Sequence, residues 1–378
     1  MTTVTLRGDR RALHVAWPNG STTDFPALFL RDNCATGFHP KTQEREFDLT
    51  SVSPELTIAG VATSTGELII DWDDRDTESR FTFDWLSTNQ PGKRLTDPAD
   101  VTPSLWRGGA TSAEMPRAQA STLLSDDAAL LAFLKETKRT GLSFVEGMAD
   151  DPEAGMTLAR RIGFLRETNF GVTFEVMSKP DPNNLAYTSH ALPLHTDLPN
   201  QELVPGFQFL HCIANEAIGG GSTFCDGFAI AEDLKRKDPD SFQLLAETAI
   251  PFRFQDGDYD IRKHYRVVER DFDGRLLEVR FNAHIAAVFD MAPVLMERYY
   301  PAYRTFMEMT RSPDYVIDTR LGRGEMVIFD NRRTLHGRTA FDPSTGFRHL
   351  RGCYVDRGEF DSRIRVLSRS IPAAARVA

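Results

Sequence analysis

The sequence predicts a mainly β protein: a jelly roll (double-stranded β-helix) flanked by helices and preceded by a small β-rich domain. Short runs of β-forming residues that end at turn residues recur along most of the chain, whereas few segments show helical spacing. A stretch from about Asn89 to Pro116 is rich in Pro, Gly, Asp and Ser, as in a linker. We therefore expect a small domain at residues 1–95, a linker at 96–118 and the jelly roll at 119–378.

The first domain is expected to consist of short strands. Leu13–Trp17 is a β run that leads into the turn Pro18–Gly20, which is typical of a hairpin. A second pair of strands is predicted at Glu67–Trp72 and Phe81–Phe83, separated by a charged turn. The segment Leu30–Cys34 lies between the two pairs.

The second domain is expected to begin with helices. Asp126 and Asp127 precede the apolar run Ala128–Lys135, and acidic residues at this end suit the helix dipole. A strand is predicted at Gly141–Val145, and a second helix at Ala154–Gly163 ends near its glycine.

The rest of the second domain is mostly β. Strands are predicted at Gly206–Ile213, Leu276–Phe281 and Glu325–Asp330, and one helix at Pro293–Thr310. Many strands with helices outside them favour a two-sheet roll with an open mouth, where a ligand and a metal ion can bind.

The composition is that of a soluble globular protein, with 41% hydrophobic and 26% charged residues. A net charge of −10 with no basic block disfavours nucleic acid as a partner and weakly favours a cationic small molecule. The four cysteines are scattered and suggest reduced thiols. No signal peptide or membrane-spanning run is recognisable, so we expect a cytoplasmic protein without a membrane partner.

His195-Thr196-Asp197, followed much later by His336, is the strongest chemical signal. On an extended strand His195 and Asp197 would share one face. Two imidazoles and one carboxylate can hold Fe(II) and leave positions open for a co-substrate and O2. The chain has nine histidines, so one H-x-D is expected by chance, and an ordinary core or surface histidine is the plain alternative.

A 2-oxo acid bound to iron needs a cation for its far carboxylate, and the planar fork of an arginine suits this role. Arg348 and Arg351 both follow His336 and are the candidates. Gly219–Gly221 predicts a tight turn, after which the hydroxyl of Thr223 is a further candidate. A plain hairpin and surface cations are the alternatives.

Several segments resemble the bacterial γ-butyrobetaine dioxygenases, which belong to the taurine-dioxygenase-like Fe(II)/2-oxoglutarate oxygenases. These segments are Leu192–Pro199, Pro205–Cys212, Gly220–Gly227, Phe329–Arg338 and Arg348–Asp356. The resemblance spans about residues 120–370 and extends more loosely over the N-terminal segment around Leu30–Cys34. The long motifs occur in the same order as in the family.

The resemblance implies a set of site residues and a reaction. His195, Asp197 and His336 match the iron ligands. Arg348 matches the arginine that binds the far carboxylate of 2-oxoglutarate, and Asn184 matches an asparagine that lies near this co-substrate in the family. Four residues match the aromatic positions that surround a trimethylammonium group in the family: Phe170, Phe174, Tyr187 and Tyr354. Two further candidates for the substrate site are Leu198 and Asn282. Without the family match, Phe170 and Phe174 would be assigned to helical core packing. The implied reaction is hydroxylation of γ-butyrobetaine to carnitine, and the family suggests a homodimer.

The chain departs from the family at two places. Relatives bind a structural zinc through a C-x-C-x-x-C run and a later histidine, whereas this chain keeps Cys34, with His39 as a possible substitute, and reads Asp74–Thr77 later. We predict that the zinc is absent and that packing around Trp72 and Trp85 stabilises the domain.

The second departure concerns the anchor of the substrate carboxylate. Some relatives have Asn-Asn and Arg after the Phe281-like strand, whereas Asn282 and His284 are the candidates here. Alternatives to the implied reaction are the same chemistry on another trimethylammonium or zwitterionic compound, a non-catalytic ligand-binding relative, and a zinc hydrolase with the same three ligands.

Overall fold

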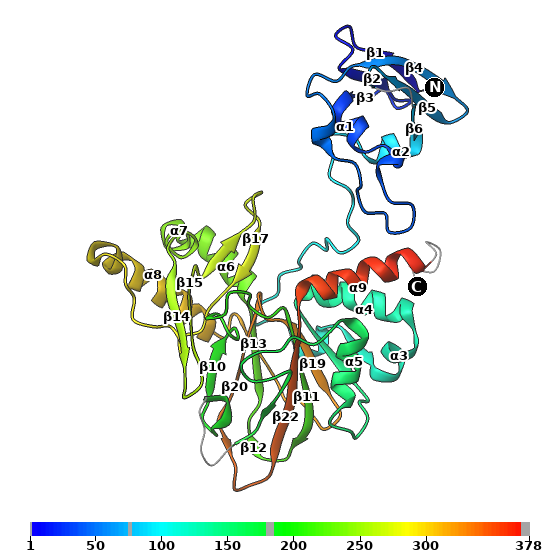
Figure 1. Ribbon diagram of the computed structural model, residues 1–378. Coiled ribbons are helices and arrows are strands. Elements are labelled where there is room, and N and C mark those ends of the chain that lie inside the picture. Colours follow the sequence, from blue (N-terminus) through cyan, green and yellow to red (C-terminus); the bar gives the residue numbers. More distant parts are fainter. Residues whose placement is uncertain (1, 75–77, 179–184, 372–378) are drawn as a thin grey trace. The chain divides into compact units, whose positions relative to one another are not determined.

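The computed structural model describes residues 2–74, 78–178 and 185–371, and the chain divides into two compact units, Met1–Asp97 and Pro98–Ala378. The first unit contains two three-stranded antiparallel sheets (Figure 1). Its strands and helices are β1 (Thr3–Leu6), β2 (Ala12–Ala16), β3 (Thr22–Pro26), α1 (Ala27–Asp32), β4 (Ile58–Ser64), β5 (Glu67–Trp72), β6 (Ser79–Thr82) and α2 (Phe83–Thr88). Both hairpins expected from the sequence are present.

The core of the first unit is apolar and includes Trp72, whose indole N–H donates to Ser79 Oγ at 2.8 Å. Trp85 packs against this core, with its ring 5.0 Å from that of Phe81. His39 Nδ1 accepts a hydrogen bond from the backbone N–H of Thr42. Residues 75–77, part of the segment that replaces the zinc-binding histidine, lie outside the described residues, and the loss of zinc stays a prediction.

The second unit is built on two sheets. The six-stranded sheet has the order β7-β8-β19-β11-β22-β9, and the four-stranded sheet has the order β10-β20-β13-β18. Their strands are β7 (Arg117–Gln119), β8 (Leu142–Glu146), β9 (Thr173–Val176), β10 (Leu192–His195), β11 (Phe207–Asn215), β13 (Ser222–Asp226), β18 (Val316–Thr319), β19 (Met326–Asp330), β20 (Thr334–Arg338) and β22 (Arg348–Val355). Smaller two-stranded sheets pair β12 (Ile218–Gly219) with β21 (Phe341–Asp342), β14 (Ile250–Gln255) with β15 (Asp260–Tyr265), and β16 (Val268–Arg270) with β17 (Leu276–Val279).

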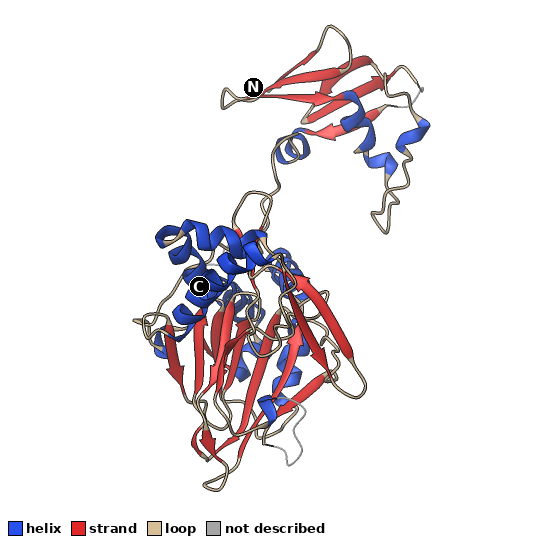
Figure 2. Cartoon of the chain, turned by 90° about the vertical axis from the view of Figure 1, so that its left-hand side faces the viewer, coloured by secondary structure: helices blue, strands red, loops and turns tan. Residues whose placement is uncertain are grey.

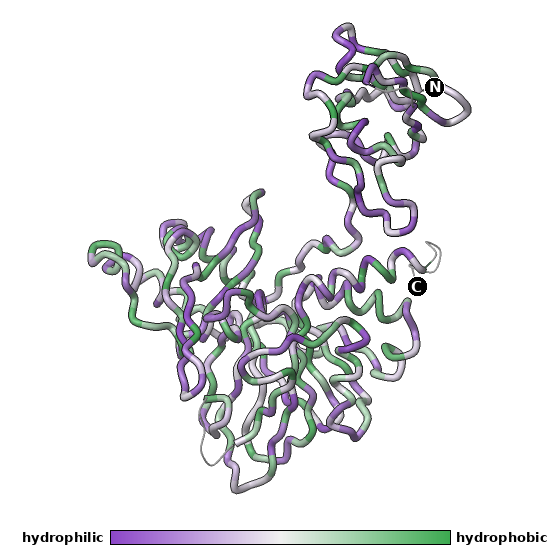
Figure 3. Tube along the Cα trace, in the orientation of Figure 1, coloured by the Kyte–Doolittle hydropathy of each residue, from purple (hydrophilic) through white to green (hydrophobic). Residues whose placement is uncertain are grey.

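Helices cover the sheets on opposite sides (Figures 1 and 2). Against the six-stranded sheet lie α3 (Ala120–Ser125), α4 (Asp127–Thr140), α5 (Ala154–Ile162) and α9 (Arg357–Ser370). A second core joins β13 and β20 to α6 (Gly227–Lys237), α7 (Pro239–Glu247) and α8 (Pro293–Arg311). The predicted helices correspond to α4, α5 and α8, and Asp126 caps α4 by accepting from two backbone N–H groups. Hydrophobic residues concentrate along the inner strands (Figure 3), and all five residues of β19 are buried.

Part of the stretch expected to be a linker packs against the second unit. The side chain of Trp106 is buried, and its indole N–H donates to the carbonyl of Thr140 at 2.8 Å. Arg107 pairs with Asp233 of α6. The second unit therefore begins near Pro98. No helix in the described ranges is long and apolar enough to cross a membrane.

Candidate active site

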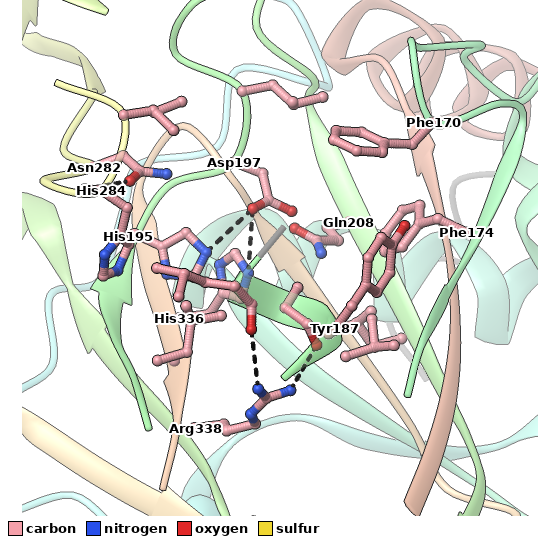
Figure 4. Close-up of a pocket in the computed structure, with 18 of the residues that line it drawn as sticks. Phe170, Phe174, Tyr187, His195, Asp197, Gln208, Asn282, His284, His336 and Arg338 are labelled. Atoms are coloured by element: carbon pink, nitrogen blue, oxygen red, sulfur yellow. Dashed lines mark hydrogen bonds and ion pairs between the residues drawn. The ribbon is translucent and has the colours of Figure 1, made fainter. Parts of the chain in front are cut away.

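His195, Asp197 and His336 come together between the two sheets (Figure 4). His195 ends β10 and pairs in register with His336 on the neighbouring strand β20. The Nε2 atoms of His195 and His336 lie 3.3 and 3.7 Å from Asp197 Oδ1. The ligand atoms of the three residues all lie within 4.8 Å of one another, and no other group in the described part of the chain meets this description.

His195 and Asp197 do not share one face of a strand, as the sequence led us to expect. Strand β10 ends at His195, and Asp197 lies in a bend before Leu198, whose φ is +54°. The buried side chain of Asn331 holds this bend. Its Oδ1 accepts from the backbone N–H of Asp197 at 2.6 Å, and its Nδ2 donates to the carbonyls of Asp197 and Pro205. A loop, not a strand, therefore places the carboxylate.

The pKa shifts of Asp197 and His336 suit a divalent metal ion, which takes neutral imidazoles and an ionised carboxylate. Burial lowers the pKa of His336 to about 3. Burial alone would raise the pKa of Asp197, but the two imidazoles and the hydroxyl of Tyr354 hold it below its usual range. His195 Nδ1 lies 2.8 Å from the carbonyl oxygen of Pro193. Because a carbonyl can only accept, Nδ1 is the donor of this hydrogen bond, and Nε2 is free to bind a metal ion.

The triad opens onto a cavity of about 400 Å³ between the sheets. One wall is aromatic: the rings of Phe174 and Tyr354 stack at 5.0 Å, and those of Phe170 and Phe254 meet edge to face at 5.3 Å. Figure 4 shows Phe170, Phe174 and Tyr187 on one side of Asp197, and His284 and Asn282 on the other. The aromatic faces suit a quaternary ammonium group, which has no hydrogen-bond donor.

Arg348 supplies a buried cation to the same cavity. Its Nε donates to the carbonyl of Gly220 at 3.1 Å, and its Nη1 is buried with no hydrogen-bond partner in the described structure. Burial lowers the pKa of Arg348 to about 10, so the guanidinium is still charged at neutral pH. Gly220 has a φ of +69°, and a Cβ there would lie 2.8 Å from Arg348 Cδ and Nε. Arg348 thus offers an unused donor to a carboxylate.

The structure separates the other candidates for the co-substrate site. On β22, Arg348, Leu350 and Tyr354 face the cavity, whereas the guanidinium of Arg351 makes ion pairs with Glu153 and Glu175. On β13, Ser222 lines the cavity and Thr223 does not. Asn184 lies outside the described residues.

The remaining sequence candidates line the cavity together: Phe170, Phe174, Tyr187, Leu198, Asn282 and Tyr354. Phe174 lies on β9 and not on a helix, so the helical spacing with Phe170 has no structural counterpart. Both ends of the Asn282 amide are occupied: Nδ2 donates to the carbonyl of Thr196, and Oδ1 accepts from the backbone N–H of His284.

Sequence reasoning missed several cavity residues. Gln208 faces the cavity from β11, and period-two alternation along that predicted strand was a usable signal. Arg338, two residues after His336, donates to the carbonyls of Ala186 and Thr188 and so holds the segment that carries Tyr187. Arg253 and Phe254 come from β14, whose position over the cavity depends on long-range pairing.

Comparisons with known proteins show the family to which this chain belongs. Residues 103–354 match the family described as "Taurine catabolism dioxygenase TauD, TfdA family". The chain belongs to this dioxygenase family. Residues 4–87 match the domain described as "Gamma-butyrobetaine hydroxylase-like, N-terminal".

Individual relatives of this dioxygenase are similar over most of its length. It is 42% identical over 361 residues to the gamma-butyrobetaine dioxygenase of Pseudomonas sp. (strain AK-1), covering 94% of this chain and 93% of that protein. It is 30% identical over 374 residues to the mitochondrial trimethyllysine dioxygenase of Gallus gallus, covering 96% and 87%. The solved structure of a taurine dioxygenase from Burkholderia xenovorans is similar with a TM-score of 0.50 at 15% identity, covering 67% of this chain and 91% of that one. The family resemblance and the fold class predicted from the sequence are confirmed.

Proposed function

We propose that this dioxygenase uses Fe(II), 2-oxoglutarate and O2 to hydroxylate γ-butyrobetaine to carnitine, a step of carnitine biosynthesis. The observation that carries the proposal is that one cavity holds a His-Asp-His triad, a buried arginine with an unused donor, and an aromatic wall. The 42% identity to a gamma-butyrobetaine dioxygenase supports the choice of substrate.

The roles of the chain's own residues follow from their contacts. His195, Asp197 and His336 would hold Fe(II), and Arg348 would bind the far carboxylate of 2-oxoglutarate through charge-assisted hydrogen bonds. Iron bound there couples the decarboxylation of 2-oxoglutarate to succinate with the insertion of one oxygen atom into a C–H bond. The aromatic and aliphatic wall excludes water and orients the substrate towards the triad. We assign no role in binding 2-oxoglutarate to Thr223 and Arg351, because neither residue lines the cavity.

We assign the substrate carboxylate to Arg253. Three arginines line the cavity, and Arg338 is engaged with backbone carbonyls while Arg348 is assigned to the co-substrate. Arg253 uses Nε and Nη2 to bind Asp260, and its Nη1 has no partner within the described ranges. Its backbone N–H donates to the carbonyl of Ile285, another cavity residue, so this hydrogen bond holds β14 beside the site. Asn282 is less suitable because its amide is already bonded at both ends.

A second candidate function keeps the chemistry and changes the substrate to another trimethylammonium compound or zwitterion. The 30% identity to a trimethyllysine dioxygenase over 96% of the chain favours this alternative over unrelated substrates. Both candidates place a trimethylammonium group against Phe174 and Tyr354.

The deciding experiment measures succinate and hydroxylated product from the full chain loaded with Fe(II), 2-oxoglutarate and O2. γ-Butyrobetaine, trimethyllysine and other quaternary amines are compared. We expect γ-butyrobetaine to give carnitine and succinate in equal amounts. Succinate without hydroxylation of any amine would refute the substrate class, and no succinate with any amine would refute the oxygenase.

The enzyme's setting is also part of the proposal. All four cysteines are buried in the protein as thiols, which supports a reducing compartment and hence the cytoplasm. The family suggests a homodimer, which sedimentation velocity tests.

We also propose that the N-terminal unit holds no zinc; about one zinc per chain after metal-free purification would contradict this. The net charge of −10 supports the absence of a nucleic-acid partner.

A further inference from the structure

Tyr354 contacts two parts of the site at once. It lies on β22 with only 3% of its surface exposed, and its hydroxyl donates to Asp197 Oδ2 at 2.7 Å. The other oxygen, Oδ1, is the one that faces His195 and His336. The two oxygens of the carboxylate therefore have different partners.

We propose that Tyr354 is a positioning residue whose hydroxyl holds Asp197 so that a single oxygen faces the metal, and that it thereby links the aromatic wall to the metal centre. This inference rests only on the metal-binding part of the proposed function. A carboxylate can bind a metal ion with one oxygen or with both. One-oxygen binding keeps coordination positions open for a chelating co-substrate and for O2.

Asp197 is restrained from two directions. Asn331 fixes its backbone by accepting from its N–H and donating to its carbonyl. Tyr354 fixes the carboxylate itself, because the bond to Oδ2 opposes rotation of that oxygen towards the metal. Partners of this kind orient metal ligands, and their loss typically weakens metal binding by ~10–100-fold.

Tyr354 is itself held by the sheet and by the aromatic wall. It pairs in register with Gln208 on β11, and its ring stacks on Phe174 with an interplanar angle of 30°. Gly352 makes this stacking possible, since a Cβ there would lie 2.4 Å from Phe174 Cζ. A ligand that packs against Phe174 and Tyr354 therefore touches the side chain that orients Asp197.

The test replaces Tyr354 by phenylalanine, which keeps the ring and removes the hydroxyl. Mn(II) affinity is measured on the full chain without 2-oxoglutarate or amine, and Co(II) is used to record the visible absorption of the site. We expect Tyr354→Phe to weaken Mn(II) binding by ~10-fold or more. We also expect its Co(II) absorption bands to differ from those of the wild type, because the freed carboxylate would be able to bind through both oxygens.

Tyr303→Phe is the matched control, because Tyr303 is buried and its hydroxyl has no partner in the described structure. It should leave Mn(II) affinity within twofold of wild type. Phe174→Leu should weaken binding of a tetramethylammonium probe by several-fold and keep the Co(II) spectrum of the wild type.

An unchanged Mn(II) affinity and Co(II) spectrum in Tyr354→Phe would overturn the proposal. If that variant does not fold, Mn(II) added to the wild-type protein should still produce a tyrosine difference absorption; its absence would also overturn the proposal. These readouts need no turnover, so a failure to hydroxylate γ-butyrobetaine would contradict the proposed function and not this inference.

Discussion

Replacing Gly220 by alanine should weaken 2-oxoglutarate binding by ~10–150-fold while the protein stays folded. Gly220 has a φ of +69°, which costs an L residue ~1–2 kcal/mol, and that cost affects stability. The effect on binding comes from the new methyl group, which would lie 2.8 Å from Arg348 Cδ and Nε. Carbon atoms normally approach no closer than ~3.5 Å, so Arg348 must shift by ~0.7 Å or more.

The shift should disturb the guanidinium at both of its ends. The bond from Arg348 Nε to the carbonyl of Gly220, now 3.1 Å, would be lost or bent, and Nη1 would move from its place in the cavity. Hydrogen bonds to a charged group contribute ~1.5–3 kcal/mol, which corresponds to a change in affinity of ~10–150-fold for one bond.

The assay is calorimetric titration of the Mn(II)-loaded protein with 2-oxoglutarate, supported by the KM for 2-oxoglutarate in succinate formation. Gly274→Ala is the matched control, because Gly274 has a φ of +79° in the same unit and no atom lies within 4 Å of its would-be Cβ. Both variants carry the backbone cost, but only one crowds Arg348. Equal 2-oxoglutarate affinities in the two variants, within threefold, would refute the assignment of Arg348.

Three further predictions test other parts of the structure. Asn331→Ala should lower the free energy of unfolding by ~2–4 kcal/mol and weaken Mn(II) binding, because it leaves buried backbone groups of Asp197 unpaired. Denaturant unfolding and Mn(II) titration measure the two effects. A loss of less than ~1 kcal/mol in the free energy of unfolding would contradict the prediction. Arg253→Met should weaken binding of γ-butyrobetaine by ~10-fold or more and leave butyltrimethylammonium, which lacks the carboxylate, unchanged; equal losses for both ligands would argue against the anchor. Hydrogen bonds from Arg107 lower the pKa of Asp233, so this pair stabilises the fold fully above the unfolded-state pKa near ~4 and less as the pH falls below it. The free energy of unfolding of Asp233→Asn, measured from pH 7 to 3, should therefore lack this part of the pH dependence of the wild type. The same pH dependence in both proteins would contradict the prediction.

The residues that we assign to the metal and the co-substrate could be proposed from the sequence because their signals are local or lie in long motifs. His195 and Asp197 are two residues apart, and Arg348 follows His336 in the next motif. The mechanism behind the spacing was wrong, since Asp197 lies in a bend fixed by Asn331 and not on strand β10. A buried hydrogen bond across the fold has no periodic signature in the sequence.

Strand alternation could have separated two of the candidates. Arg348 and Arg351 are three positions apart on β22, so their side chains point to opposite faces of the sheet. Only Arg348 faces the cavity, and Arg351 pairs with Glu153 and Glu175. The sequence alone did not place Arg253, because β14 reaches the cavity through its bridge to the segment that follows Phe281.

The two sheets carry different parts of the proposed site. His195 and His336 lie on the four-stranded sheet, whereas Arg348, Tyr354 and Phe174 lie on the six-stranded sheet. The substrate wall can therefore change on β9 and β14 without moving the histidines. The bond from Tyr354 to Asp197 crosses this division, so a change of the tyrosine ring that suits a new cation also changes the support of the metal ligand. Substitutions at Phe174 or Phe254 should alter substrate preference at constant metal affinity, and those at Tyr354 should alter both.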